Sequence, residues 1–103
     1  MKSIGRDIFK AVHEGKWLSI EYRNKQGSVT RYWIGIYDID IYKRQLLVEG
    51  LNIASCVNKE LTLYIDGIIS ANVIDGTYQP INQSLVEYIK LNPNKYAFIL
   101  QQG

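Results

Sequence analysis

The sequence predicts a domain of the α+β class that is mainly β with flanking helices. Apolar residues recur at helical spacing up to Gly15, alternate at every second position from Trp17 to Ile74, and return to helical spacing after Pro80. Turns rich in glycine and aspartate divide the middle section into five short β segments. Five strands with short turns favour a strongly bent antiparallel sheet that closes into a small barrel, because closure removes exposed strand edges.

Residues 4–15 are expected to form the N-terminal helix. Ile8 and Val12 share one apolar stripe of this segment. Ser3 suits the N-cap position, and Gly15 suits the left-handed residue that ends many helices.

Residues 17–76 are expected to form the barrel. Its first strand, 17–23, directs Leu18 and Ile20 toward the core, and a polar turn at Asn24–Gly27 returns the chain antiparallel. The other expected elements are, in chain order, a return strand at 29–37, a turn at 40–44, a strand at 46–51, a polar loop at 54–59, and strands at 61–65 and 68–74.

A C-terminal helix is expected over 80–91, where Asn92-Pro93 ends it and can start another. Residues 92–103 form an apolar tail. That tail either packs onto the barrel or begins the next region of a longer protein. With 103 residues, the chain is expected to be a single domain, 1–103.

The composition excludes several classes of protein. With 47% apolar and 21% charged residues, wholesale disorder is not expected. No apolar run approaches the ~20 residues that cross a bilayer, and the N-terminus lacks the apolar stretch of a secretion signal. Cys56 is the only cysteine, which excludes an intramolecular disulfide and fits a cytoplasmic location. Residues 1–44 hold nine basic against five acidic side chains, so any footprint for a polyanion is expected there.

The chain is not expected to be an enzyme or to hold a metal or cofactor. His13 has no partner for a zinc site or a catalytic triad and suits a surface or capping role, and Cys56 suits a bystander role in a polar loop. Turn chemistry or a solvated hairpin explains the prominent carboxylates, although paired carboxylates can also hold a hard cation. These carboxylates are Asp38, Asp40, Asp66 and Asp75.

One constellation predicts binding. Aromatic and basic side chains fall on the face opposite the core stripe of the first hairpin, and such a face can stack bases and hold phosphates. These side chains are Trp17, Arg23, Arg31, Trp33 and Tyr37, and Lys43 and Arg44 at a turn tip add a second contact candidate. The alternative is that the N-terminal or C-terminal helix packs over both tryptophans, which would make them packing residues.

Three segments, Ile8–Val12, Leu18–Tyr22 and Leu63–Asp75, resemble a WYL domain, a family found in bacterial regulators and in defence or repair proteins. The resemblance implies an Sm-like small barrel over roughly residues 8–78 and a nucleic acid or nucleotide-like ligand. The triplet that names the family falls near Leu46-Leu47-Val48 here. Tyr64 and Gly67 stand where the family has arginines, so much of its chemistry for anionic ligands is absent.

A second group of segments is similar to the N-terminal accessory region of large bacterial helicase-like ATPases. These segments are Gly15–Tyr22, Tyr32–Ile34, Val48–Leu51 and Asn92–Tyr96. The chain lacks the motor's Gly-x-x-x-x-Gly-Lys-Ser/Thr motif.

Together the resemblances imply a non-catalytic accessory or regulatory module. Its expected partners are single-stranded or duplex nucleic acid, or a nucleotide-like ligand, and a following domain of the same protein; no membrane is expected. The alternative is a protein-docking or self-association module, such as a homodimer formed through the aromatic face.

Overall fold

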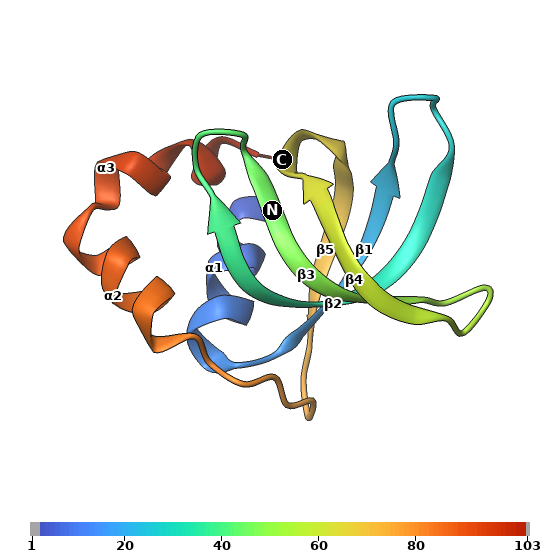
Figure 1. Ribbon diagram of the computed structural model, residues 1–103, viewed down its shortest axis with the longest axis horizontal. Helices are drawn as coiled ribbons and strands as arrows, with labels where there is room; N and C mark the ends of the chain where they lie inside the picture. Colours follow the sequence, from blue (N-terminus) through green and yellow to red (C-terminus); the bar gives the residue numbers. More distant parts are fainter. Residues whose placement is uncertain (1–2, 103) are drawn as a thin grey trace.

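A strongly bent sheet lies beside a group of helices (Figure 1). The computed structural model describes residues 3–102. The elements, in chain order, are α1 (Ile4–Glu14), β1 (Trp17–Arg23), β2 (Val29–Asp40), β3 (Gln45–Asn52), β4 (Asn58–Tyr64), the 3₁₀ turn η1 (Ile65–Gly67), β5 (Ile68–Ile74), α2 (Gln83–Leu91), α3 (Pro93–Tyr96) and the 3₁₀ segment η2 (Ala97–Gln101). The predicted α+β class, with an N-terminal helix, five strands and a C-terminal helix, is confirmed.

Both ends of α1 follow from the sequence. Ser3 Oγ accepts a hydrogen bond from the Arg6 backbone N–H, and Gly15 adopts the left-handed conformation with φ 67° and ψ 51°. The Gly15 N–H donates to the Ala11 carbonyl, as is common at a glycine-ended helix. Because glycine adopts this conformation without strain, the chain turns directly from α1 into β1.

The sheet is antiparallel, with the strand order β4-β3-β2-β1-β5. In the first hairpin Leu18 lies opposite Ile34 and Ile20 lies opposite Tyr32, as the alternation predicts. The register of β2 with β3 shifts between Ile36 and Asp38. A bulge changes which face later residues occupy, so Ile36 and Ile39 are both buried although they are three residues apart.

The predicted closure into a barrel is not confirmed. The ladders among residues 3–102 leave β4 and β5 as the two edges of an open sheet. The short turn η1 joins these edges at one end (Figure 1). At this end the backbone N–H of Tyr64 donates to the phenol oxygen of Tyr22, so a side chain rather than a strand satisfies that donor.

The core lies between the sheet and the helices. One stripe of α1 packs against the inner face of the sheet, and the C-terminal segment completes the cluster. The side chains with less than 2% exposure are Ile8, Leu18, Ile20, Ile34, Leu46, Val48, Ile65, Leu85 and Ile99.

The C-terminal segment differs from the expectation at its start. Helix α2 begins at Gln83 rather than at residue 80, because Asn82 is its N-cap and accepts a hydrogen bond from the Leu85 N–H. Pro93 begins α3 as predicted. The tail packs onto the rest of the domain, as the first alternative proposed, since Tyr96 and Ile99 are buried in the core cluster.

Several strand bounds also differ. Strand β2 extends to Asp40, past its expected end at residue 37 and into the start of the expected turn. Strand β4 begins at Asn58, inside the stretch expected to be a polar loop, and Ile65 belongs to η1 rather than to a strand. Asn58 pairs with Leu51 across the β3–β4 hairpin, so the hairpin ladder extends further than the apolar pattern indicates.

No helix within residues 3–102 has both the length and the apolar character needed to cross a bilayer.

Candidate ligand-binding site

An aromatic pocket of about 390 Å³ opens on the outer face of the sheet, the face that does not carry the core. Four strands and the loop after β5 contribute to its walls. The lining residues are Trp17, Trp33, Leu51, Asn58, Thr77 and Tyr78.

The register of the strands explains this assembly. Trp33 on β2 lies opposite Ser19 on β1 and Leu51 on β3, and Leu51 lies opposite Asn58 on β4. Paired residues on neighbouring strands project to the same face, and Trp17 projects there too because it precedes Ser19 by two residues. Residues from distant parts of the sequence therefore meet in one pocket.

The loop after β5 is tied to the start of β1. The backbone N–H of Trp17 donates to Thr77 Oγ1 over 3.0 Å, and the indole Nε1 donates to the Tyr78 carbonyl over 2.7 Å. The Gln79 N–H donates to the Gly15 carbonyl over 2.8 Å. These bonds hold the Trp17 indole in one orientation and hold the loop as a wall of the pocket.

A glycine in β2 gives this loop its place on the sheet. A Cβ at Gly35 would collide with the side chain of Gln79, which is 8% exposed. The absence of a side chain at Gly35 therefore lets Gln79 pack against the strand, two residues from Trp33.

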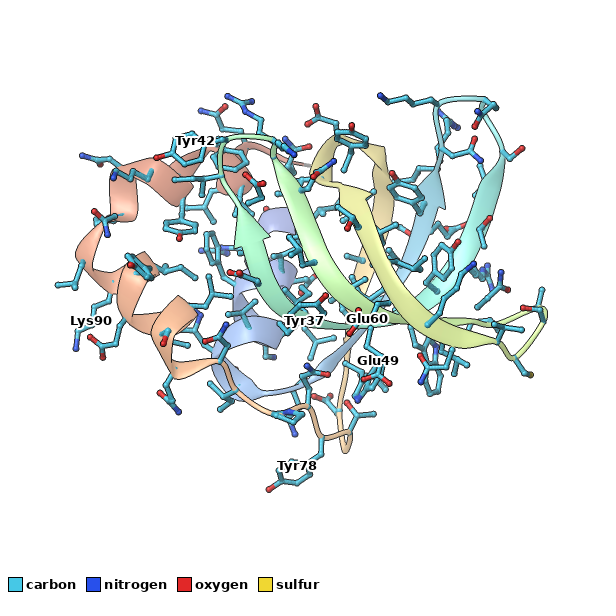
Figure 2. The ribbon with its side chains drawn as sticks, in the orientation of Figure 1. Tyr37, Tyr42, Glu49, Glu60, Tyr78 and Lys90 are labelled. Carbon is cyan, nitrogen blue, oxygen red and sulfur yellow. The ribbon has the colours of Figure 1, made fainter. Side chains whose placement is uncertain are left out.

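Neither flanking helix covers the pocket. Its lining residues all come from strands and from the loop after β5, and Trp33 is 40% exposed. The alternative in which a helix packs over both tryptophans is therefore wrong. Trp17 is half-buried, and the residues beside it in the pocket are Thr77 and Tyr78. Figure 2 shows Tyr78 projecting away from the body of the protein, and its side chain is 91% exposed.

Two cationic side chains flank the pocket. Arg31 is exposed and lies two residues before Trp33 on the same face of β2, opposite Glu21. On the other flank the Nζ atom of Lys16 lies 5.9 Å from the centroid of the Tyr78 ring. Aromatic rings between two cations form a surface that can stack a base and contact phosphate.

The other predicted basic residues lie elsewhere. Arg23 lines a separate pocket beside η1, in which Lys25 Nζ lies 4.7 Å from the centroid of the Tyr64 ring. Lys43 and Arg44 lie in the β2–β3 turn, and the Arg44 guanidinium lies 4.8 Å from the centroid of the ring of Phe98 in η2. The structure thus brings Trp17, Trp33 and Arg31 together, and it separates Arg23, Lys43 and Arg44 from them.

Tyr37 belongs to a neighbouring pocket with an acidic character. Figure 2 shows Tyr37 near Glu49 and Glu60, and these three residues line a pocket of about 360 Å³ with Asn58 and Lys59. Asn58 lines both pockets, and its Nδ2 donates to Glu49 Oε1 over 2.7 Å. The aromatic pocket therefore has a carboxylate rim on its β3–β4 side.

Sequence reasoning missed five residues of the site: Lys16, Leu51, Asn58, Thr77 and Tyr78. Asn58 fell in an expected loop, and Tyr78 follows the last strand in a segment without periodicity. The indole–carbonyl bond that places Tyr78 joins residues 61 positions apart. No local pattern in the sequence signals such a contact.

His13 and Asp40 make local contacts that give them structural roles. His13 Nδ1 lies 2.8 Å from the Phe9 carbonyl oxygen, near the end of α1. Asp40 Oδ1 accepts from the backbone N–H groups of Tyr42 and Lys43, which is turn chemistry. Cys56 is exposed. Within residues 3–102 no group of three or more His, Cys, Asp or Glu side chains is arranged to hold a metal ion.

Comparison with the models of known protein families and with curated proteins finds no match.

Proposed function

We propose that this chain is a non-catalytic accessory or regulatory module that binds nucleic acid or a nucleotide-like ligand, with a base stacked in the pocket between Trp17 and Trp33. The observation that carries the proposal is the exposed Trp33 indole in a preformed aromatic pocket, with Arg31 beside it on the same face. Stacking of a base on an aromatic side chain contributes about 1–3 kcal/mol.

The proposal includes the family relationship. An N-terminal helix runs into a strand that has Tyr22 near its end, and four further antiparallel strands follow, which supports a WYL-like domain with an opened Sm-like barrel. A role beside a helicase-like motor or within a regulator, and a cytoplasmic setting, are parts of the same proposal. The free and exposed Cys56 supports a reducing compartment.

Intrinsic fluorescence can test this function directly. The chain has two tryptophans, and both line the pocket. We expect a 12-nucleotide single strand, the matching duplex or a mononucleotide to quench this fluorescence at low salt. Quenching should weaken in Trp33→Ala and Arg31→Ala but not in Tyr42→Ala, whose side chain is 89% exposed in the distant β2–β3 turn. Absence of quenching by all three ligands at low salt would refute the proposal.

A second candidate function is protein docking or self-association through the same face. The observation that favours it is the set of exposed apolar side chains near the pocket, namely Ile53, Val57 and Tyr78. Ile53 N–H donates to the Arg31 carbonyl, which places the β3–β4 turn beside the basic end of this face. Sedimentation that depends on protein concentration, and that loses this dependence in Trp33→Ala, would support this candidate.

A further inference from the structure

We propose that the ligand of the aromatic pocket is a single nucleotide, with its base stacked between Trp17 and Trp33 and its phosphate bound by Lys16. This inference rests on the proposed function and narrows it from nucleic acid in general to a small ligand that carries one base and one phosphate group.

The position of Lys16 favours a contact with a phosphate beside the pocket. Its Nζ atom lies 5.9 Å from the centroid of the Tyr78 ring, which projects outward from a residue that lines the pocket. The chain immediately after Lys16 is fixed, because Trp17 donates two hydrogen bonds to the loop that carries Tyr78. A flexible lysine on a fixed backbone can move its ammonium from the ring to a phosphate at the edge of the pocket.

The positions of the other cations do not favour a long nucleic-acid strand. A nucleic-acid strand needs a basic track along its backbone. Here Lys25 lies over Tyr64 and Arg44 lies over Phe98, and neither ring belongs to the aromatic pocket. The cations that flank the aromatic pocket are Lys16 and Arg31, and Lys59 lies in the adjoining pocket together with Glu49 and Glu60.

The carboxylate rim of the aromatic pocket also disfavours a long strand. Glu49 and Glu60 lie directly opposite each other on β3 and β4, and both line the pocket that adjoins the aromatic one through Asn58. A strand that continued past Asn58 would bring its phosphates against these carboxylates, and like charges repel at such distances. The surface therefore favours a small ligand that stays within the pocket over a strand that continues past Asn58.

The volume of the pocket agrees with this assignment. At about 390 Å³ it lies in the lower part of the range for small-molecule sites, which is roughly 300–1,000 Å³. A base with its sugar fits a pocket of this size, and the phosphate remains at the edge on the flank of Lys16.

Paired nucleosides and nucleotides test the inference. Tryptophan fluorescence should be titrated with adenosine, AMP, uridine, UMP and a mixed-sequence 12-nucleotide single strand. At least one nucleotide should bind about three- to tenfold more tightly than its nucleoside, because a charge-assisted contact to phosphate is added. Lys16→Gln should remove this difference without weakening nucleoside binding. Lys43→Gln, which makes the same charge change in the exposed β2–β3 turn, should preserve the difference.

Each contrary result would overturn a different part of the proposal. Equal affinity for nucleoside and nucleotide in the unmodified protein, or a difference that survives Lys16→Gln, would overturn the phosphate assignment. A 12-nucleotide strand that binds more than about tenfold tighter than either nucleotide, with several phosphates contributing to its salt dependence, would overturn the single-nucleotide assignment. If none of the five ligands changes the fluorescence, the proposed function itself fails.

Discussion

The phenol oxygen of Tyr22 accepts a 3.2 Å hydrogen bond from the backbone N–H of Tyr64, a residue 42 positions further along the chain. Tyr22 lies in β1 and Tyr64 is the last residue of β4, and these strands are not neighbours in the sheet. The bond thus joins β1, the neighbour of the edge strand β5, to the other edge strand, β4, next to the turn that leads into β5. It draws the two ends of the open sheet together without a ladder between them.

Removal of this phenol oxygen should destabilise the protein. In Tyr22→Phe the ring remains in place while the Tyr64 N–H loses its acceptor. We expect the free energy of unfolding to fall by about 1 kcal/mol, the typical net contribution of one hydrogen bond. Urea unfolding measures this change. Tyr42→Phe, at a side chain that is 89% exposed, is the matched control. Equal unfolding midpoints for the two variants would contradict the role assigned to Tyr22.

Addition of a methyl group at Gly67 should also destabilise the folded protein. A Cβ there would lie 2.5 Å from Cε1 of Tyr22 and 2.8 Å from the Arg23 carbonyl oxygen. Either the ring or η1 must move, so we expect Gly67→Ala to lower the free energy of unfolding by about 1–3 kcal/mol.

A double-mutant cycle isolates the part of this cost that comes from the ring. In a Tyr22→Ala background, Gly67→Ala should cost less than it does in the unmodified protein, because the nearest obstacle is gone. Strictly additive effects would show that the clash with the ring does not determine the cost.

Replacement of Gln79 should raise stability. Its Oε1 atom is buried and has no hydrogen-bond partner within residues 3–102. A buried polar atom without a partner costs free energy, so Gln79→Met, which keeps the shape of the side chain, should raise the free energy of unfolding by about 1 kcal/mol. Thermal unfolding measures the change, and Gln83→Met at the exposed start of α2 is the control. A lower melting temperature for Gln79→Met than for the control would contradict this account.

Stability should fall at alkaline pH because of Tyr96. Burial raises the pKa of this phenol above its ordinary value of 10.0, and the charges of Asp38 and Tyr88 add to the effect. Above pH 10 the unfolded chain loses the Tyr96 proton while the folded protein keeps it, so the folded state binds more protons and the free energy of unfolding decreases with pH. The stabilisation that comes from the raised pKa of Tyr96 is fully present below pH 10. It is lost as the pH rises through the pKa of Tyr96 in the folded state.

Comparison of two variants tests this assignment. Tyr96→Phe cannot ionise, so it should lose less stability than the unmodified protein between pH 9 and pH 11 in urea unfolding. Tyr42→Phe should retain the full loss, because its ring is 89% exposed rather than buried. Identical pH profiles for both variants would exclude Tyr96 as the source.

The positions of helices and strands were predictable from the sequence where interactions between neighbouring residues determine them. The cap at Ser3 and the left-handed Gly15 bound α1, and Pro93 starts α3 as expected. The alternation of apolar and polar residues predicted which residues of β1 face the core. The start of α2 was predicted three residues early because helical spacing was expected from residue 80, whereas the N-cap is Asn82. The position of an N-cap depends on which side chain reaches the free backbone N–H groups. More than one residue near the start of α2 has a side chain that could do so.

The site was predictable only in part. Alternation placed Trp17, Arg31 and Trp33 on one outer face, and the structure confirms that these residues share it. The same reasoning also placed Arg23 and Tyr37 there, yet they line different pockets. A face of a bent sheet is long, so a shared face does not bring residues at its two ends together.

The sequence by itself determined the order of elements, the antiparallel first hairpin and the outward direction of Trp33, since caps, turns and alternation act over a few residues. Tertiary structure alone decided whether the sheet closes and whether a helix covers the tryptophans. It also decided which loop forms the wall of the pocket. These outcomes depend on contacts such as Tyr22 with Tyr64 and Trp17 with Tyr78, which join positions 42 and 61 residues apart. Such contacts leave no periodic signal, because they arise only when separate elements pack against one another.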